Sequence, residues 1–385
     1  MAILKTTPDL AVRKTTGSFS ATFTTSTGTV TIDFGDGGVE ESNTPSNTYT
    51  ADPPYLINTT SEPSNITGID LSSQSLTAFD LSRYFNIDDV DVSGNSLRVK
   101  DIGKILLSLD DFGLENGSID ISSNSQELGL TPEEDAAKES LIAKGWTITG
   151  LATDWTPSSM TTAAWFDAAD YSTITEAGNV SQWNDKSGNT RHAVEATATE
   201  QPAYNSADPL MNELPSIGNN NDGLRRYLTP TGAFTARNIY FIGYYNDTSF
   251  FSWMVPVGSV DNTPRTSGQS GQNYWAADAT TTYIHKDGDG STNYLGASSL
   301  PILPMTPTLW EVEWNADYNE TWRMFSAGSS WQKWTEGGAL SEVIFTDGTE
   351  TTDTRQKLEG YLAHKWGTTE SLPIDHPYKT RKPIV

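Results

Sequence analysis

The sequence has no cysteine among its 385 residues, which excludes disulfide bonds and cysteine-ligated zinc sites. Long apolar runs are also missing, because no stretch approaches the roughly 18 residues that a membrane-spanning helix needs. The opening residues, MAILKTTPDLAVRKTT, lack the apolar core and small-residue cleavage site of a signal peptide. We therefore expect a protein with neither a membrane anchor nor a cleaved leader.

Basic residues are scarce. The chain carries 24 lysines and arginines against 49 acidic residues, for a formal net charge of −25. A field of this sign repels phosphate backbones and anionic lipid surfaces. We therefore expect no nucleic-acid or membrane partner. Solubility in a salty or crowded medium is the simplest reason for the charge, and a cationic partner or a calcium-rich surface is the alternative.

Tryptophan and histidine are absent from the first 145 residues, although the whole chain has 12 tryptophans and four histidines. Glycine, threonine, proline and serine accumulate in GWTITGLATDWTPSS, which begins at the end of that stretch. This shift in composition predicts a domain boundary there. Together with the repeats described below, it divides the chain into three predicted domains at residues 1–56, 57–152 and 157–385.

The first segment is strand-like. In FSATFTTSTGTVTIDFG, apolar residues alternate toward one face, and these are Phe19, Ala21 and Phe23 before a turn at Gly28 and Val30, Ile32 and Phe34 after it. DFGDGGVEE then predicts a second hairpin. The Asp-Phe-Gly-Asp-Gly turn resembles that of polycystic-kidney-disease (PKD) type β-sandwiches. Asp33 and Asp36 are candidates for a cation site, but turn formation is the interpretation that we favour.

The second segment contains an internal repeat. ITGIDLSSQSL, IDDVDVSGNSL and NGSIDISSNSQ share an apolar-Asp-apolar-Ser core, with Asp70, Asp91 and Asp120 at equivalent places. Each unit predicts a short strand with aliphatic side chains inward and a turn at Asn or Gln. One unit cannot bury its apolar face alone, so the units are expected to stack. This geometry explains the repeated aspartates without assigning them a function.

Two helices are predicted beside the repeats. VKDIGKILLSLDDFGL places Ile102, Ile105, Leu106 and Leu109 on one side, and TPEEDAAKESLIAKGW has Pro near its start and acids in its first turn. Repeats and helices together resemble the short leucine-rich modules of bacterial surface proteins and tailed-phage structural proteins. The resemblance covers about residues 64–150 and implies a stacked α/β module.

The third segment predicts strands separated by turns, followed by one helix. Short apolar stretches such as RNIYFIGYY and TLWEVEW alternate with Asn, Gly and Asp, a pattern typical of two facing antiparallel sheets. RQKLEGYLAHKWG then predicts an amphipathic helix whose apolar face comprises Leu358, Tyr361, Leu362 and Trp366. Asp353 and Gln356 are spaced as in a capping box, and Gly367 is the predicted stop. Gly360, unfavourable inside a helix, predicts close packing against a sheet.

Both ends of this segment carry a family resemblance. WFDAAD, ITEAGNVSQWNDKSGN and QPAY at its start, with SEVIFTDG, RQKLEGYLAHKWG and LPIDHPYK at its end, resemble a concanavalin A-like, laminin-G-type jelly roll. That family occurs in phage tail and head-appendage proteins and in bacterial surface proteins. The resemblance implies a mainly β fold: a C-terminal β-sandwich with a terminal helix, preceded by the leucine-rich module and a small N-terminal β domain.

Because concanavalin-like sandwiches include glycan hydrolases, we looked for paired acids. Glu311 and Glu313 alternate with tryptophans in WEVEW and lie about 7 Å apart along a strand. Inverting glycosidases need carboxyls about 6.5–9.5 Å apart, so spacing alone leaves catalysis open. However, Ala316 stands where the related laminarinases carry a third acid. We favour a plain strand with charged residues outside and tryptophans inside, and no enzymatic activity.

Two candidate ligand sites remain. Tyrosine and tryptophan faces stack on pyranose rings, and the candidates for a glycan platform are Tyr274, Trp275, Trp331 and Trp334. HKDGDGSTN resembles the opening of a calcium loop at Asp287 and Asp289, but its later ligand positions are missing. A hairpin turn at Asp-Gly is the interpretation that we favour, so we expect no cofactor, with calcium as the one candidate.

These observations lead to one functional hypothesis. We expect a structural virion protein of a tailed bacteriophage, acting as a head decoration, head fibre or tail appendage. Its N-terminal region would bind other capsid or tail proteins while the sandwich contacts host surface glycans, and the appendage would be a homo-oligomer. A bacterial cell-surface adhesin or carbohydrate-binding protein is the alternative, and a glycan hydrolase is a weaker one.

Overall fold

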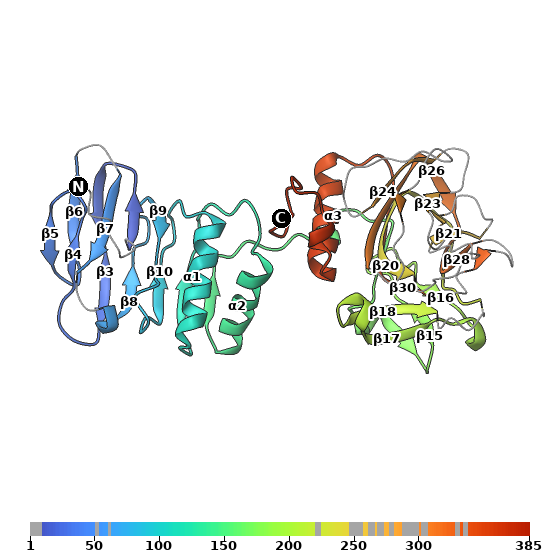
Figure 1. Ribbon diagram of the computed structural model, residues 1–385, viewed down its shortest axis with the longest axis horizontal. Helices are drawn as coiled ribbons and strands as arrows, with labels where there is room; N and C mark the ends of the chain where they lie inside the picture. Colours follow the sequence, from blue (N-terminus) through green and yellow to red (C-terminus); the bar gives the residue numbers. More distant parts are fainter. Residues whose placement is uncertain are drawn as a thin grey trace. The chain divides into compact units, whose positions relative to one another are not determined.

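The protein is described from a computed structural model that covers residues 10–50, 54–60, 63–219, 225–245, 257–260, 266–267, 273–276, 281–286, 300–301, 307–327, 332–333 and 338–385. These residues form a mainly β protein with three α-helices in the described part (Figure 1). The chain divides into two compact units. Unit 1 comprises residues 1–154 and 381–385, and unit 2 comprises residues 155–380.

Unit 1 contains short strands in three sheets. One sheet has the order β5-β4-β7-β1-β9, a second pairs β2 with β6, and a third has the order β12-β11-β10-β8-β3. The strands are β1 Ala11–Arg13, β2 Gly17–Ser20, β3 Thr22–Thr25, β4 Thr31–Asp33, β5 Val39–Glu41, β6 Ser46–Tyr49, β7 Tyr55–Thr59, β8 Ile66–Asp70, β9 Leu76–Phe79, β10 Asp89–Asp91, β11 Ser118–Asp120 and β12 Thr147–Thr149.

The turn at Gly28 does not close a hairpin. Strand β3 pairs with β8 instead, and β4 pairs with β5 and β7. The expected hairpin is therefore wrong, because both strands find partners elsewhere in unit 1. The second hairpin, β4–β5, is confirmed. Asp33 and Asp36 each accept a hydrogen bond from the backbone N–H two residues ahead, both at 2.9 Å, as turn-forming aspartates do.

The three repeats stack as predicted. Strands β8, β10 and β11 are parallel and in register, so that Ile69, Val90 and Ile119 lie side by side. The turn after each strand is held by amides. The Asn95 side chain accepts from the N–H of Gln74 at 2.9 Å and donates to the carbonyl of Leu71 at 2.9 Å. Each amide therefore joins one repeat to the previous one.

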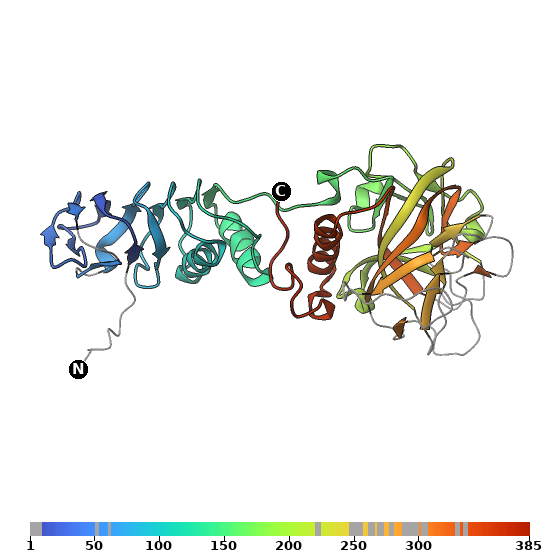
Figure 2. The ribbon, with the colours of Figure 1, turned by 90° about the horizontal axis from the view of Figure 1, so that it is seen from above.

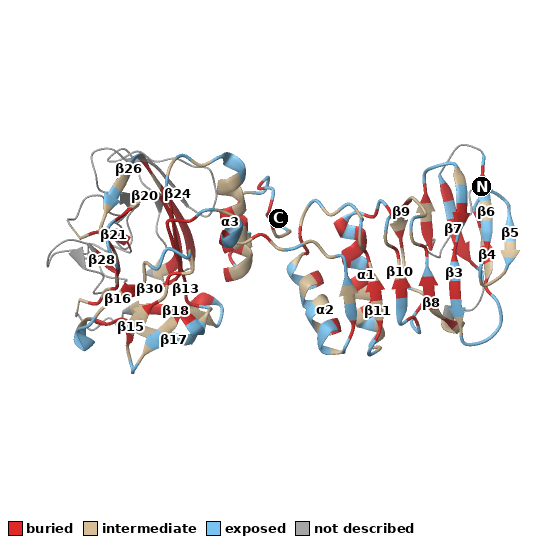
Figure 3. Cartoon of the chain, turned by 180° about the vertical axis from the view of Figure 1, so that it is seen from behind, coloured by how far each residue is buried: buried red, intermediate tan, exposed pale blue. Residues whose placement is uncertain are grey.

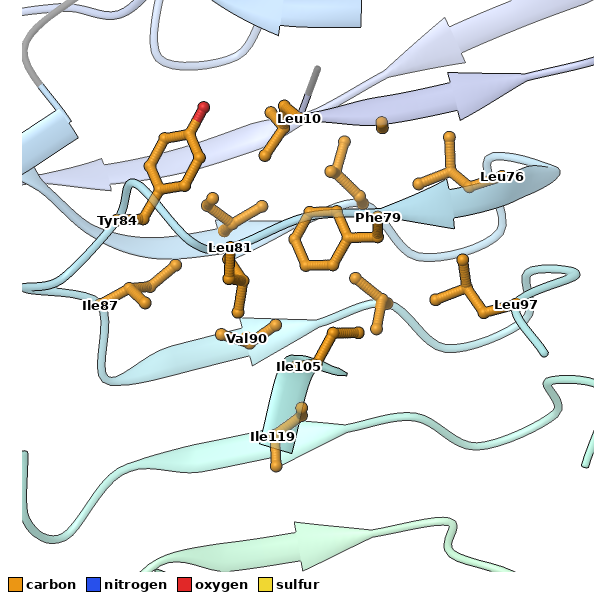
Figure 4. Packing of buried hydrophobic residues seen from close by; sticks show 14 of the residues in the cluster. Leu10, Leu76, Phe79, Leu81, Tyr84, Ile87, Val90, Leu97, Ile105 and Ile119 are labelled. Carbon is orange, nitrogen blue, oxygen red and sulfur yellow. The ribbon is translucent and has the colours of Figure 1, made fainter. Parts of the chain in front are cut away.

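The expected helices are present in unit 1. They are α1 Val99–Phe112 and α2 Pro132–Ala143, and α2 begins with a capping box in which Thr131 and Glu134 exchange hydrogen bonds. Figures 1 and 2 show α1 and α2 side by side. The four apolar residues predicted for α1 are fully buried. They belong to one hydrophobic core that runs from Leu10 to Trp146 (Figure 4), so the expected boundary at residues 56–57 falls within a shared core.

Unit 2 contains a seven-stranded sheet of order β17-β18-β30-β20-β26-β24, with β13 also paired to β30, and a four-stranded sheet of order β14-β15-β16-β19. The described strands of unit 2 are β13 Ala164–Asp167, β14 Ile174–Glu176, β15 Val180–Trp183, β16 Ala193–Val194, β17 Ala203–Asp208, β18 Leu214–Asn219, β19 Thr229–Pro230, β20 Phe234–Tyr245, β21 Val257–Ser259, β22 Thr266–Ser267, β23 Asn273–Ala276, β24 Thr281–Lys286, β25 Leu300–Pro301, β26 Thr308–Glu320, β27 Trp322–Met324, β28 Ser326–Ala327, β29 Gln332–Lys333 and β30 Gly338–Thr346.

The seven-stranded sheet is covered on both faces. All nine residues of β30 are buried (Figure 3). One face packs into an aromatic-rich core with the four-stranded sheet, through residues such as Trp310, Trp314 and Phe345. The other face packs against helix α3, Thr352–Trp366, through Leu358, Leu362 and Trp366. Burial on both sides explains why β30 is mostly apolar, with Ser341, Glu342 and Thr346 as its buried polar residues.

Helix α3 differs from the expectation at its start. Its N-cap is Thr351, whose hydroxyl accepts from the N–H of Thr354, while Asp353 lies in the first turn. Gly367 ends the helix with φ of 70°, as predicted. Gly360 faces the returning chain rather than the sheet, because a Cβ there would lie 2.5 Å from the Cβ of Tyr378. The close packing was predicted, but its partner was not.

In the described part of the chain, no helix is both long and apolar enough to cross a membrane.

Candidate functional site

The candidate ligand residues from the sequence cannot be placed as side chains. Tyr274 and Trp275 belong to strand β23, but their side chains are outside what the structure describes. Trp331, Trp334, Asp287 and Asp289 lie outside the described residues altogether. The glycan platform and the calcium loop therefore stay predictions. Among the described residues, no group of three or more histidines and acids could hold a metal ion.

The acid pair considered for catalysis is placed clearly. Trp310, Val312 and Trp314 face the aromatic-rich core, as predicted. Glu311 points to the opposite face, where helix α3 covers it and leaves only 2% exposed. The expectation that both acids lie outside is therefore wrong for Glu311. Glu313, on the same face, is partly exposed and pairs with Arg237 at 3.3 Å.

Glu311 belongs to a buried group of polar side chains, here called the Glu311 cluster: Tyr240, Glu311, Glu350, Arg355, Glu359 and His376. Arg355 Nη1 donates to Glu359 Oε1 at 2.8 Å, and His376 Nε2 lies 3.0 Å from Glu359 Oε2. Tyr240 joins the remaining two acids, because its hydroxyl contacts Glu311 and Glu350. Glu359 comes from α3 and His376 from the returning chain, so the cluster joins both to the sheet.

Two carboxyls of the Glu311 cluster, those of Glu311 and Glu359, differ in how readily they ionise. Glu311 Oε2 is buried without a hydrogen-bond partner, and Arg355 Nη1 lies 3.9 Å from it. Burial raises the pKa of Glu311 well above its ordinary value, and the neighbouring Glu359 carboxyl adds to the effect. Burial alone would also raise the pKa of Glu359, but hydrogen bonds from His376 and Glu311 and the charge of Arg355 lower it. Of the two carboxyls, Glu311 therefore keeps a proton more readily and Glu359 ionises more readily.

A second buried acid is bonded to the C-terminal half of α3. Glu342, on β30, is fully buried and accepts four hydrogen bonds, in what is here called the Glu342 cluster. The donors are Trp165 Nε1 at 2.6 Å, Trp366 Nε1 at 2.7 Å, Lys365 Nζ at 2.7 Å and Tyr361 Oη at 2.9 Å. Burial raises the pKa of Glu342, although the Lys365 charge opposes this. Three of the four donors come from α3, so this acid positions the helix.

In unit 1, the chain's last residues form a comparable attachment, here called the C-terminal clamp: Glu134, Asp135, Arg381 and Lys382 with the backbone at 129–130. Arg381 donates two hydrogen bonds to Glu134, at 2.6 and 2.8 Å. Lys382 pairs with Asp135 at 2.6 Å, and its carbonyl accepts from the N–H of Gly129 at 2.7 Å. The sequence signal was weak, since only the acids at the start of α2 stand out.

The repeats also expose a polar sheet face on β3, β8, β10, β11 and β12. It forms a hollow of about 430 Å³ whose lining includes Asp70, Asp89, Asp91 and Asp120. The three repeated aspartates each accept from a backbone N–H two residues ahead, at 2.8–2.9 Å. Those bonds shape the repeat turns, as the sequence predicted, so they give the aspartates a structural role.

No family model matches the sequence, and no curated protein does. Among solved structures, the chain is similar to catalytic domains of a GH87 alpha-1,3-glucanase in complex with tetrasaccharides or with nigerose, at 9% identity and a TM-score of 0.19 over 35% of this chain and 22% of that chain. Another of these domains shows 8% identity, a TM-score of 0.18 and coverage of 40% and 27%. The chain spans about a quarter of those proteins, and a TM-score of this size carries no argument about fold or activity.

Proposed function

We propose that this chain is a structural display and attachment protein of a tailed-phage particle, and not an enzyme. In this proposal, unit 2 is a concanavalin A-like sandwich, and unit 1 combines the PKD-like strands with the leucine-rich stack. Unit 1 would bind other capsid or tail proteins, and unit 2 would contact host surface glycans. The phage setting rests on the resemblance of these segments to modules of phage appendages.

The observation that carries the proposal is the return of the chain to unit 1. The chain leaves unit 1 after Asp154 and re-enters it at Arg381, where the C-terminal clamp holds it. Unit 2 is therefore connected to unit 1 through both of its ends. Two connections, the second secured by a partly buried bidentate ion pair, suit a domain that must stay attached under load.

The buried acids of unit 2 support the same proposal. Glu311, one of the two WEVEW acids that a hydrolase would need, is covered by α3 and bonded to Tyr240. Its raised pKa would suit a general acid in an open cleft, but here the carboxyl is buried. These acids hold helix α3 on the sheet through hydrogen bonds and ion pairs.

Immunogold electron microscopy tests the proposal. Antibodies raised against the purified chain would be applied to tailed particles and to envelope fractions of cells that produce the protein. The proposal predicts gold at a fixed position on tailed particles. Gold confined to the cell envelope, with unlabelled particles, would contradict it and favour the bacterial adhesin.

A further inference from the structure

Two sheet edges of unit 2 carry a pair of tyrosines. Strand β14 is the outer strand of the four-stranded sheet, and β17 is an outer strand of the seven-stranded sheet. Tyr204 lies on β17, and Tyr171 lies in the 3-10 turn Tyr171–Thr173 that leads into β14. Their ring centroids are 5.3 Å apart at an interplanar angle of 43°. The rings therefore meet where the edges of the two layers come together.

The two rings differ in burial. Tyr204 is partly buried and packs against the aromatic-rich core, so it closes the edge between the sheets. Tyr171 is 56% exposed and does not belong to that core. Tyr171 therefore packs on Tyr204 and still offers more than half of its surface to a ligand.

Both rings are held in a fixed orientation. The Tyr171 hydroxyl donates to Glu176 Oε1 at 3.2 Å, and the Tyr204 hydroxyl donates to the carbonyl of Ala168 at 3.3 Å. A ring that is already oriented loses little conformational freedom when a ligand stacks on it. The pair thus presents a prepared aromatic face with a carboxylate at its rim.

The charge beside the rings is negative. Glu176 has no basic partner among the described residues, whereas the nearby Asp167 and Asp170 are both paired with Lys186, at 2.8 and 3.0 Å. The unpaired Glu176 carboxylate can accept hydrogen bonds from hydroxyl groups and can pair with an ammonium group. It repels another carboxylate.

We propose that Tyr171, Tyr204 and Glu176 form a binding platform for a neutral or amine-bearing pyranose ring. The C–H face of the sugar stacks on Tyr171, and a sugar hydroxyl or amine donates to Glu176. Uronic and sialic acids are excluded by charge. This inference rests on the proposed attachment function and names the class of glycan that unit 2 contacts.

The test is a binding assay with the full chain on immobilised tetrasaccharides of three kinds: neutral glucans, deacetylated chito-oligosaccharides and uronic-acid oligomers. The wild type should bind the first two and not the third. Tyr171→Ala should weaken binding roughly tenfold, as for loss of one aromatic contact, whereas Tyr171→Phe, which keeps the ring, should lose less. Glu176→Gln should bind the chito-oligosaccharides more weakly than the wild type does and should tolerate uronic acids.

Phe85→Ala is the matched control, because Phe85 is a 52% exposed aromatic residue of unit 1. This variant should bind the sugars as tightly as the wild type does. Thermal unfolding of Tyr171→Ala should stay unchanged, which separates binding from stability. Wild-type protein that binds none of the sugars overturns the platform. Binding that survives Tyr171→Ala also overturns the platform. Neither result bears on particle attachment, which the immunogold labelling tests independently.

Discussion

Glu134 and Arg381 lie 247 positions apart in the sequence and share a bidentate ion pair with bonds of 2.6 and 2.8 Å. The carboxylate of Glu134 occupies a notch that exists because residue 103 of α1 is glycine, where a Cβ would lie 2.0 Å from the carboxyl carbon. The same carboxylate caps helix α2 through the N–H of Thr131. One side chain therefore starts a helix and holds the end of the chain.

Replacing Arg381 should release the C-terminal clamp. In Arg381→Met, the Glu134 carboxylate stays nearly buried without its cation, which should destabilise unit 1 by about 3 kcal/mol. Hydrogen exchange should accelerate at the N–H groups of Gly129 and Val385, which bond to Lys382 and Thr153 in the folded chain.

Lys382→Met is the matched control for that experiment. One of the two acidic partners of Lys382, Asp154, is 43% exposed, and exposed ion pairs contribute at most about 1 kcal/mol. Equal losses of unfolding free energy in Arg381→Met and Lys382→Met would contradict the special role given to Arg381.

Gly360 should tolerate no side chain while Tyr378 is present. Alanine gains about 1 kcal/mol of helix propensity, but its Cβ would lie 2.5 Å from the Tyr378 Cβ, and overpacking costs typically 1–3 kcal/mol. We expect Gly360→Ala to destabilise unit 2 by about 1 kcal/mol in chemical denaturation. In a Tyr378→Gly background, which removes that Cβ, the same change should become stabilising, and additive effects would show that the two residues are not coupled.

Glu342→Gln should be strongly destabilising. Glutamine offers one acceptor oxygen and turns its amide N–H groups toward donors, so some of the four donors around Glu342 lose their partner. We expect a loss of about 3 kcal/mol and a shift in tryptophan fluorescence, since Trp165 and Trp366 both donate to this carboxyl.

Glu313→Gln is the control for Glu342, because Glu313 is a partly exposed acid of the same sheet with one cation, Arg237. Its unfolding free energy should change by less than about 1 kcal/mol. A larger effect at Glu313 than at Glu342 would show that burial does not govern these acids.

The sequence predicted what depends on local spacing. The repeat placed Ile69, Val90 and Ile119 on neighbouring strands, and the apolar positions at 358, 362 and 366 define the buried face of α3. Hydrophobic periodicity records which side of an element is buried, and these predictions needed nothing else.

The sequence could not show which residues meet over long distances. The pairing of β3 with β8 rather than β4 depends on strands 40 residues further along. Likewise, alternation in WEVEW separates acids from tryptophans, but it cannot reveal that a helix covers the acid face. Glu311 was therefore expected in solvent and is buried instead. Contacts such as that of Arg381 with Glu134 leave no periodic signal.

The central claim is that the buried acids of unit 2 hold helix α3 on the sheet. Within this claim, Glu311 is the neutral carboxyl and Glu359 is the ionised one. Because its folded pKa is raised, Glu311 stabilises the fold fully below pH 4.5, and this contribution is lost as pH rises through the folded pKa. Glutamine imitates a protonated glutamate and can donate to Glu359, so Glu311→Gln should avoid that loss.

The decisive measurement is the unfolding free energy of Glu311→Gln and Glu359→Gln from pH 5 to pH 8. The account predicts that Glu311→Gln stays within about 1 kcal/mol of the wild type at pH 5 and gains on it as pH rises. Glu359→Gln, which removes the closer of the two carboxyls beside Arg355, should lose about 3 kcal/mol of unfolding free energy. A large loss in Glu311→Gln beside an unaffected Glu359→Gln would contradict the account.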